Sequence, residues 1–151
     1  MSNDEIPQMP NASGDSLVYT EDTMSILLAD DQPKVRFALR VLLEQQPGFE
    51  TLDEAVDLGD LFIRAKKAHP KIVLLSWELP GLNSDCLSLL RKHSPDTAVI
   101  ALSGRPEARQ AALEAGVDAF VSKADPPERL LDTIERVRRE RHKPTGKPEP
   151  A

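Results

Sequence analysis

Residues 72–81 read IVLLSWELPG, and this stretch decides the fold. Its first four residues are all large and aliphatic, so a strand built from residues 72–75 would be apolar on both faces. Strands of that kind are typical of a parallel sheet that helices cover on both sides. The hydroxyl of Ser76 follows directly, at the point where this strand should end. The stretch therefore predicts a buried strand of an α/β domain, with a polar group at its carboxyl end.

Further apolar runs lie on either side of this stretch and alternate with helical patterns. Strands are predicted at residues 26–29, 49–53, 72–75, 97–102 and 119–122. After each of them, apolar residues recur at helical spacing, as they do at Val35, Leu39, Leu42 and Leu43. This alternation favours right-handed crossovers and a doubly wound, five-stranded parallel sheet with five helices, which is an α/β three-layer sandwich.

Local signals predict where several of these helices begin. Pro33 suits the first turn of the first helix. Either Ser84 or Asp85 can cap a short third helix. Asp125 and Glu128 resemble a capping box in front of the fifth helix.

The fourth helix is predicted to have an unusually small inner face. Pro106 opens this helix, and Gly116 is placed to end it. Its inward stripe consists of Ala108, Ala111, Ala112 and Ala115. Such a stripe favours close packing of the helix against the sheet.

Composition limits the classes of function that the chain can have. Its 151 residues, of which 40% are hydrophobic and 29% charged, suit one domain with one core. A formal net charge of −6 argues against direct binding of nucleic acid through a basic surface. The longest apolar run, residues 98–102, is far shorter than the roughly 20 residues that a membrane-spanning helix needs. The single cysteine, Cys86, suits a buried position in a protein of the reducing cytoplasm.

The two ends of the chain differ from the middle. Residues 1–24 contain five acidic residues, no lysine or arginine and no periodicity, which predicts a disordered acidic leader. Residues 141–151 contain three prolines and are predicted to form a disordered tail. The folded domain is then expected over residues 25–140.

Polar residues follow four of the five predicted strands. They are Asp30 and Asp31, Ser76, Ser103 and Lys123. Because ligands of open parallel sheets bind beyond the carboxyl ends of the strands, we expect these groups to converge on one shallow site. Each residue alone also has a structural interpretation. Aspartate and serine after strands commonly cap helices, and the lysine can simply neutralise the two acids.

In this order, the motifs resemble the receiver domain of bacterial two-component response regulators. The matching segments are ILLADD (26–31), IVLLSWELPG (72–81), VIALSG (99–104) and FVSK (120–123). The resemblance covers roughly residues 25–140. It implies the CheY-like fold of that family, in which the five parallel strands lie in the order 2-1-3-4-5.

The resemblance also implies a role for each polar residue. Asp30 and Asp31 would hold a magnesium ion, mainly through Asp31, with the backbone carbonyl of Glu78 as a further ligand. Ser103 would bond a phosphoryl oxygen, and Lys123 would pair with the phosphorylated group.

The chain departs from the family at the phosphoacceptor. The position of the nucleophilic aspartate holds Ser76, and a serine hydroxyl is a weak nucleophile unless a base activates it. Asp30, Asp31 and Lys123 then give the site a charge of −1, where the family has −2, so any magnesium binding should be weakened. Ala124 also stands after the lysine, where the family usually has proline.

These features predict a stand-alone, degenerate receiver that acts as a phosphorylation-independent adaptor. The few residues after the fifth helix cannot hold an output domain, so output is expected to pass through a protein partner. A histidine kinase or a regulator of the same pathway fits that role. Ser76 lacks the G-x-S-x-G surroundings of an esterase-type nucleophile, so no enzyme is predicted. The alternative is a conventional phosphorelay receiver that takes phosphate at Asp30, Asp31 or Ser76.

The resemblance places the interaction surface on the fourth helix, the fifth strand and the fifth helix. In the family this face serves for docking or for homodimer formation. Phe120 falls at the aromatic switch position of the fifth strand. Nearby charged residues of the expected face include Arg105, Arg109 and Arg129.

Overall fold

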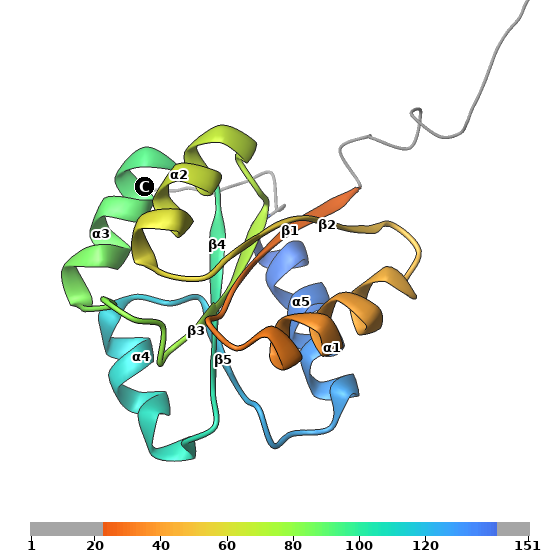
Figure 1. Cartoon of the computed structure of the whole chain (residues 1–151). Helices are drawn as coiled ribbons and strands as arrows, with labels where there is room; N and C mark the ends of the chain where they lie inside the picture. Colours follow the sequence, from red (N-terminus) through yellow and green to blue (C-terminus); the bar gives the residue numbers. More distant parts are fainter. Residues whose placement is uncertain (1–22, 142–151) are drawn as a thin grey trace, which may run out of the picture.

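The computed structural model describes residues 23–141, which form alternating strands and helices (Figure 1). The strands are β1 (Met24–Ala29), β2 (Phe49–Ala55), β3 (Ile72–Ser76), β4 (Ala98–Ser103) and β5 (Ala119–Ser122). The helices are α1 (Pro33–Glu44), α2 (Leu58–Ala68), α3 (Ser84–His93), α4 (Arg109–Ala115) and α5 (Pro127–Arg141), with a short 3-10 helix at Pro106–Ala108. The predicted strands agree with these to within two residues at each end.

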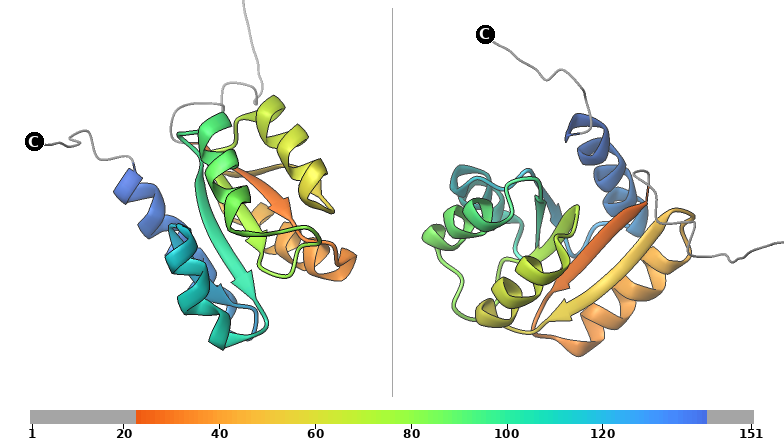
Figure 2. Two further views of the ribbon diagram at one scale, coloured as in Figure 1. Left: turned by 90° about the vertical axis from the view of Figure 1, so that its left-hand side faces the viewer. Right: turned by 90° about the horizontal axis from the view of Figure 1, so that it is seen from above.

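The strands form one parallel sheet in the order β2-β1-β3-β4-β5. Helices α1 and α5 cover one face of the sheet, whereas α2, α3 and α4 cover the other, as the view from above shows (Figure 2). The predicted strand order and the three-layer α/β sandwich are therefore confirmed.

Both faces of the central strands are buried, as the aliphatic runs indicated. In β1, Ile26 and Leu28 pack on the side of α1 and α5, whereas Leu27 and Ala29 pack on the side of α2, α3 and α4. All four side chains have 0% exposure. A parallel strand between two helical layers has no face in contact with solvent. Its sequence is therefore continuously apolar and does not alternate between polar and apolar residues.

The edge strand β2 is half-buried, and arginines of the flanking helices form ion pairs with two of its acidic residues, Asp53 and Glu54. Arg36 of α1 pairs with Glu54 at 2.8 Å. Arg64 of α2 pairs with Asp53 at 2.5 Å and with Asp60 at 2.7 Å. The hydrogen bonds to Asp53 and then to Asp60 raise the pKa of the Arg64 guanidinium above its usual value. Charged side chains on an edge strand disfavour pairing with the sheet of another molecule.

The folded domain extends beyond the predicted residues 25–140 at both ends. Strand β1 begins at Met24, the last residue of the predicted leader. The Met24 side chain is buried in the core, and its N–H donates to the Gly48 carbonyl at 2.6 Å. Helix α5 runs to Arg141, the first residue of the predicted tail, whose guanidinium binds Asp118 at 3.3 Å and the Pro95 carbonyl at 3.0 Å. The rest of the predicted leader and tail lies outside the described residues.

Two predicted helix caps are wrong. Asn83, rather than Ser84 or Asp85, caps α3, because the Asn83 side chain accepts a hydrogen bond from the Asp85 N–H at 2.9 Å. The predicted capping box of α5 does not form, since that helix begins two residues after Asp125. The Asp125 carboxylate instead accepts a hydrogen bond from the Ser122 N–H at 3.2 Å, in the turn between β5 and α5.

The fourth helical segment is divided into a 3-10 turn and the helix α4. Gly116 ends α4 as predicted, with a left-handed φ of 109°. Ala108 and Ala112 are buried and Ala115 is half-buried, but Ala111 is exposed. The predicted stripe is therefore wrong at this residue, because one helical step of about 100° turns it away from the sheet.

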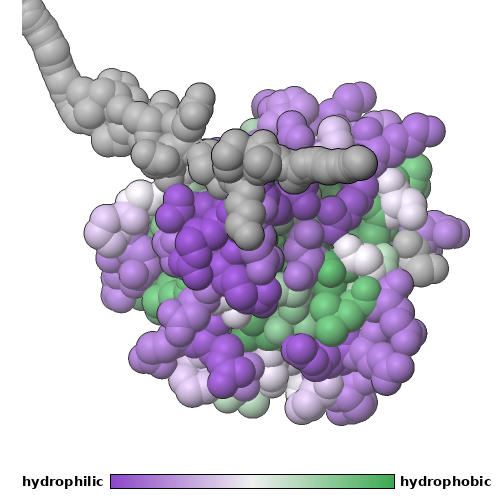
Figure 3. All heavy atoms as spheres, turned by 180° about the vertical axis from the view of Figure 1, so that it is seen from behind, coloured by the Kyte–Doolittle hydropathy of each residue, from purple (hydrophilic) through white to green (hydrophobic). Residues whose placement is uncertain are grey.

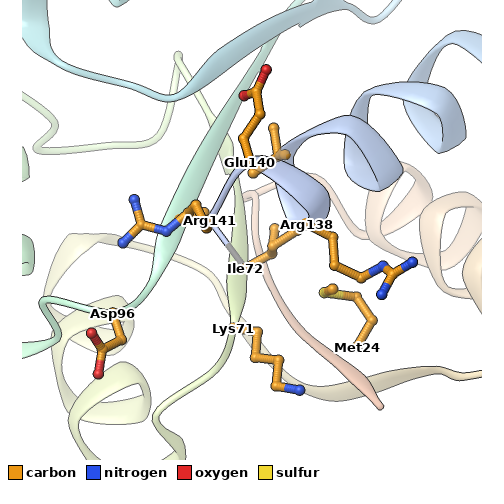
Figure 4. A pocket seen from close by; sticks show the side chains of 9 residues that line it. Met24, Lys71, Ile72, Asp96, Arg138, Glu140 and Arg141 are labelled. Carbon is orange, nitrogen blue, oxygen red and sulfur yellow. The ribbon is translucent and has the colours of Figure 1, made fainter. Parts of the chain in front are cut away.

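A pocket of about 480 Å³ opens at the amino-terminal edge of the sheet, beside the end of α5 (Figure 4). Met24 and Ile72 contribute apolar surface to it, and Lys71, Asp96 and Arg138 contribute charged groups. This edge is opposite to the carboxyl ends of the strands, where open parallel sheets bind their ligands. The pocket therefore lies apart from the polar residues that the sequence singled out.

Hydrophobic side chains on the surface occur in small groups among hydrophilic ones, as the face drawn in Figure 3 shows. The large hydrophobic residues that are exposed are Phe37, Val41, Val56, Ile63, Leu89 and Leu113. In the part of the chain that the structure describes, no helix combines the length and the apolar character needed to cross a membrane.

The buried core predicts a stability difference between two leucine variants. Leu74→Ala should lower the free energy of unfolding by about 2–5 kcal/mol, because it removes methyl groups from the centre of the sheet. Leu113→Ala is the matched control, since this leucine of α4 is 39% exposed, and it should cost less than about 1 kcal/mol. Urea unfolding measures both losses. Equal losses would show that the core is assigned wrongly.

Candidate functional site

Strand pairing brings the polar strand ends together at one edge of the sheet. Ser76 at the end of β3 pairs with Leu102 of β4, and Ser103 at the end of β4 pairs with Ser122 of β5. The ladder continues past the strands, because the Lys123 N–H donates to the Ser103 carbonyl at 2.8 Å. Side chains from β1, β3, β4 and the end of β5 therefore share one site.

Asp30 is a buried residue with two neighbours at its carboxylate and a third at its backbone carbonyl. Its side chain is only 2% exposed, and Oδ1 accepts a hydrogen bond from the Gln32 N–H at 2.9 Å. Its Oδ2 is buried and has no hydrogen-bond partner within residues 23–141. The Lys123 ammonium nitrogen lies 2.9 Å from this oxygen, so an ion pair balances its negative charge. Arg36 binds the Asp30 carbonyl at 2.7 Å and so fixes the backbone.

Ser76 is fully buried beside this ion pair. Its Oγ accepts a hydrogen bond from the Lys123 ammonium at 3.2 Å and another from the Glu78 N–H at 3.3 Å. Lys123 therefore bridges the ends of β1 and β3, as an ionic partner of Asp30 and a hydrogen-bond donor to the serine. The expected structural role of the lysine as a neutralising cation agrees with this geometry.

Ser103 takes part in a second group of contacts. Its hydroxyl donates to Glu78 Oε2 at 2.6 Å, and its Oγ accepts from the Arg105 N–H at 3.0 Å. The Arg105 guanidinium lies 3.6 Å from the same carboxylate oxygen. Ser103 is completely buried, whereas Glu78 and Arg105 are exposed, so the contact runs from the core to the surface. The site therefore consists of two linked groups, one around Lys123 and one around Glu78.

The donor set fits a magnesium ion poorly. Both carboxylate oxygens of Asp30 are already engaged, by Gln32 and by Lys123. Asp31 is exposed to solvent, and Ser76 supplies a neutral hydroxyl where a third carboxylate would stand. Within residues 23–141, no three acidic, histidine or cysteine side chains are grouped in a way that could hold a metal ion. Divalent cations of this kind prefer charged oxygen ligands.

The structure places Phe120, Arg109 and Arg129 on the expected elements, whereas Arg105 lies in the loop before them. Phe120 of β5 is half-buried and packs on the side of the sheet that α2, α3 and α4 cover. Arg105 precedes the 3-10 turn, Arg109 begins α4 and Arg129 lies in the first turns of α5, and all three are exposed. The side chain of Arg105 also reaches the polar site through Glu78.

Two side-chain contacts of the site, one of Glu78 and one of Arg36, are not predicted from the sequence. Glu78 is predicted to act through its backbone carbonyl, and the structure shows in addition that its carboxylate accepts a hydrogen bond from the Ser103 hydroxyl. Arg36 was not singled out, although it binds the Asp30 carbonyl. The position of Glu78, two residues after Ser76, indicates that it lies near the end of β4, but nothing in the sequence fixes the direction of its side chain. No local pattern marks Arg36.

Comparison with known proteins agrees with the fold and with the motifs. The family model of the response regulator receiver domain matches residues 26–135. This chain belongs to the response regulator receiver family. It is a receiver of two-component signalling, so the resemblance of its strand-end motifs is confirmed at the level of the family.

Relatives of this receiver include regulators of transcription. The nitrate/nitrite response regulator NarP of Escherichia coli K12 is 30% identical over 112 residues, which are 72% of this chain and 52% of NarP. The transcriptional activator ExaE of Pseudomonas putida is 31% identical over 118 residues, which are 76% of this chain and 55% of ExaE. The chain thus spans about half the length of these curated relatives.

Solved structures share the arrangement of strands and helices. A two-component response regulator of the LuxR family from Aurantimonas sp. SI85-9A1 is 29% identical, with a TM-score of 0.70 over 76% of this chain and 84% of that one. The response regulator domain of Thermotoga maritima CheB is 24% identical, with a TM-score of 0.67 over 76% of this chain and 96% of that one. The similarity to the CheB domain shows that the two proteins share a fold.

The ion pair between Lys123 and Asp30 predicts a coupled effect on stability. Lys123→Ala should lower the free energy of unfolding by about 1–3 kcal/mol, because it leaves a buried carboxylate without its cation. Adding Asp30→Asn removes that charge, so the double variant should be more stable than the sum of the two single losses implies. Urea unfolding of the four proteins gives the coupling energy. Strictly additive losses would show that the contact does not stabilise the receiver.

Proposed function

We propose that this receiver is an adaptor that binds a protein partner without being phosphorylated. The observation that carries the proposal is the residue at the end of β3. Ser76 stands there, where the family resemblance places the nucleophilic aspartate. It lies 3.2 Å from the Lys123 ammonium nitrogen, so it also occupies the place beside the lysine that the resemblance assigns to the phosphoacceptor.

The surroundings of Ser76 do not help it to accept phosphate. A serine hydroxyl attacks phosphorus efficiently only when a neighbouring base takes its proton. Among residues 23–141, the groups that contact the Ser76 oxygen are the Lys123 ammonium and the Glu78 N–H, and both are donors. Neither group can accept the proton. The hydroxyl is therefore expected to keep its proton and to remain unreactive.

The Ser103 hydroxyl, which by resemblance to the family would bond a phosphoryl oxygen, already donates a hydrogen bond to the Glu78 carboxylate. Ser103 donates to Glu78 Oε2 at 2.6 Å, a distance typical of a charge-assisted hydrogen bond. The positive Arg105 side chain lies 3.6 Å from the same oxygen. A negative charge is thus present beside Ser103 without phosphorylation. This supports a receiver whose signalling surface has one fixed state, because a switch needs a ligand that binds two states differently.

Weak magnesium binding is part of the same proposal. A divalent cation would have to compete with Lys123 for the Asp30 carboxylate, whose Oδ2 lies 2.9 Å from the lysine nitrogen. Ser76 adds no negative charge to offset this competition. Asp31 and the Glu78 carbonyl remain the groups that would hold the ion.

Output is proposed to pass through the face of α4, β5 and α5. Arg105, Arg109 and Arg129 give this face exposed positive groups, which suit an acidic surface on the partner. The partner is a histidine kinase or a regulator of the same pathway, and a second copy of the chain can use the same face. The regulatory roles for which NarP and ExaE are named belong to those longer proteins.

Acetyl phosphate with magnesium tests the absence of phosphorylation. The parent chain should gain no phosphoryl mass, because Ser76 lacks a base. Ser76→Asp should gain one phosphoryl group that hydroxylamine removes, because Asp30, Asp31, Ser103 and Lys123 are still present. Intact-mass spectrometry measures both. Ser76→Asp should also bind magnesium more tightly, and the fluorescence of the neighbouring Trp77 reports it.

The control for this experiment is Ser76→Asn, which has the shape of aspartate without its charge. It should neither gain phosphate nor bind magnesium more tightly than the parent. A stoichiometric mass gain of the parent chain would overturn the proposal. If hydroxylamine removes that mass, Asp30 or Asp31 is the acceptor, and if hydroxylamine does not, Ser76 is the acceptor.

Binding to the partner provides a second test. Arg109→Glu and Arg129→Glu should each weaken association by roughly three- to tenfold, because they reverse the surface charge of the docking face. Lys123→Ala should change association little at temperatures where the variant is folded. A quantitative pull-down with the kinase or regulator of the pathway measures all three. Loss of binding with Lys123→Ala alone would show that the polar site, rather than the arginine face, controls association.

A further inference from the structure

A hydrophobic patch lies exposed between α2 and α3, on the side of the sheet away from α1 and α5. Ile63 is 68% exposed and Leu89 is 46% exposed. Together with Phe62, Lys66 and His93 they line a hollow of about 320 Å³, and we call these five residues the α2–α3 patch. Large apolar side chains gathered on two neighbouring helices are typical of a surface that another segment covers.

Basic side chains surround one end of the α2–α3 patch. Lys66 and Lys67 lie in the last turn of α2, and Lys92 and His93 lie in the last turn of α3. None of the ion pairs formed within residues 23–141 involves any of the three lysines. The patch therefore suits a segment that combines apolar side chains with negative charge.

Both helices end at the edge of the sheet where the described chain begins. Lys71, three residues after α2, donates its N–H to the Ser25 carbonyl of β1 at 3.0 Å. Thr97, four residues after α3, donates its hydroxyl to the Pro70 carbonyl at 2.6 Å. The start of β1 and the end of α2 lie at the same edge in Figure 1. The residues that precede Thr23 therefore join the domain next to the basic end of the α2–α3 patch.

Residues 1–22 have the complementary composition. They contain five acidic residues and no lysine or arginine. Residues 15–22 read DSLVYTED, so an apolar triplet, Leu17, Val18 and Tyr19, stands between acidic residues. The triplet lies four to six residues before Thr23 and can reach about 13–20 Å from it when extended, which is comparable to the length of about 16 Å of the helix α2. The segment is long enough to follow the groove between the two helices.

We propose that residues 1–22 dock on the α2–α3 patch of the same chain. The triplet of residues 17–19 covers Ile63 and Leu89, and the flanking acids face the lysines at the ends of α2 and α3. Burial of the apolar side chains favours the contact, and the opposite charges give it orientation. The contact involves neither Ser76 nor Lys123, so it stands or fails independently of the proposed adaptor function.

Paramagnetic relaxation enhancement on the complete chain tests this docking. A nitroxide is attached at Thr20→Cys, next to the triplet, in a Cys86→Ser background that removes the single native cysteine. We expect selective loss of the amide signals of α2 and α3 around Ile63 and Leu89, with the signals of α1 retained. The lost signals should return in part in about 1 M salt, where the Debye length falls to about 3 Å.

Matched surface variants complete the test. The double variant Ile63→Ser and Leu89→Ser should restore the signals of α2 and α3. Phe37→Ser is the control, because Phe37 of α1 is 68% exposed, as Ile63 is, but lies on the opposite face of the sheet; it should change nothing. Signal loss spread equally over both faces, or unaffected by the double variant, would overturn the docking. Signal loss in isotope-labelled chains mixed with nitroxide-labelled unlabelled chains would assign the patch to a second copy and overturn it as well.

Discussion

The Lys123 ammonium group is the contact on which the polar site depends. It lies 2.9 Å from the Asp30 carboxylate and 3.2 Å from the Ser76 hydroxyl, and so connects the ends of three strands. One cation then faces one buried carboxylate, which is a balanced pair. A second carboxylate at position 76 would leave the site with excess negative charge, the condition that favours a divalent cation. The serine therefore changes the electrostatics of the whole site and not only its nucleophile.

The hydrogen bond between Ser103 and Glu78 is a second feature that favours a receiver independent of phosphate. The Trp77 N–H donates to the Leu102 carbonyl at 2.7 Å, which holds the loop after β3 against the end of β4. This contact brings the Glu78 carboxylate to 2.6 Å from the Ser103 hydroxyl. Position 76 has no carboxylate that could accept phosphate, and the Glu78 carboxylate already occupies the Ser103 hydroxyl. Both observations favour a receiver that does not depend on phosphate.

The sequence predicted the strand order and the meeting of the polar residues because both follow from short-range rules. Asp30, Ser76, Ser103 and Lys123 each follow a strand directly, and parallel strands align their carboxyl ends. The direction of the Glu78 side chain depends on a loop held by a neighbouring strand, so no local pattern contains it. The ends of the domain depend on distant contacts in the same way, since Gly48 holds the start of β1 and Asp118 holds the end of α5.

An NMR titration of the parent chain with beryllium fluoride and magnesium is the most direct measurement of phosphate independence. Beryllium fluoride mimics a phosphoryl group when a carboxylate oxygen binds it, and Ser76 offers none. The backbone amide signals of Ser103, Phe120 and Lys123 should therefore stay unchanged throughout the titration. Saturable shifts of these three signals would contradict a site that is held in one state by Lys123 and Glu78.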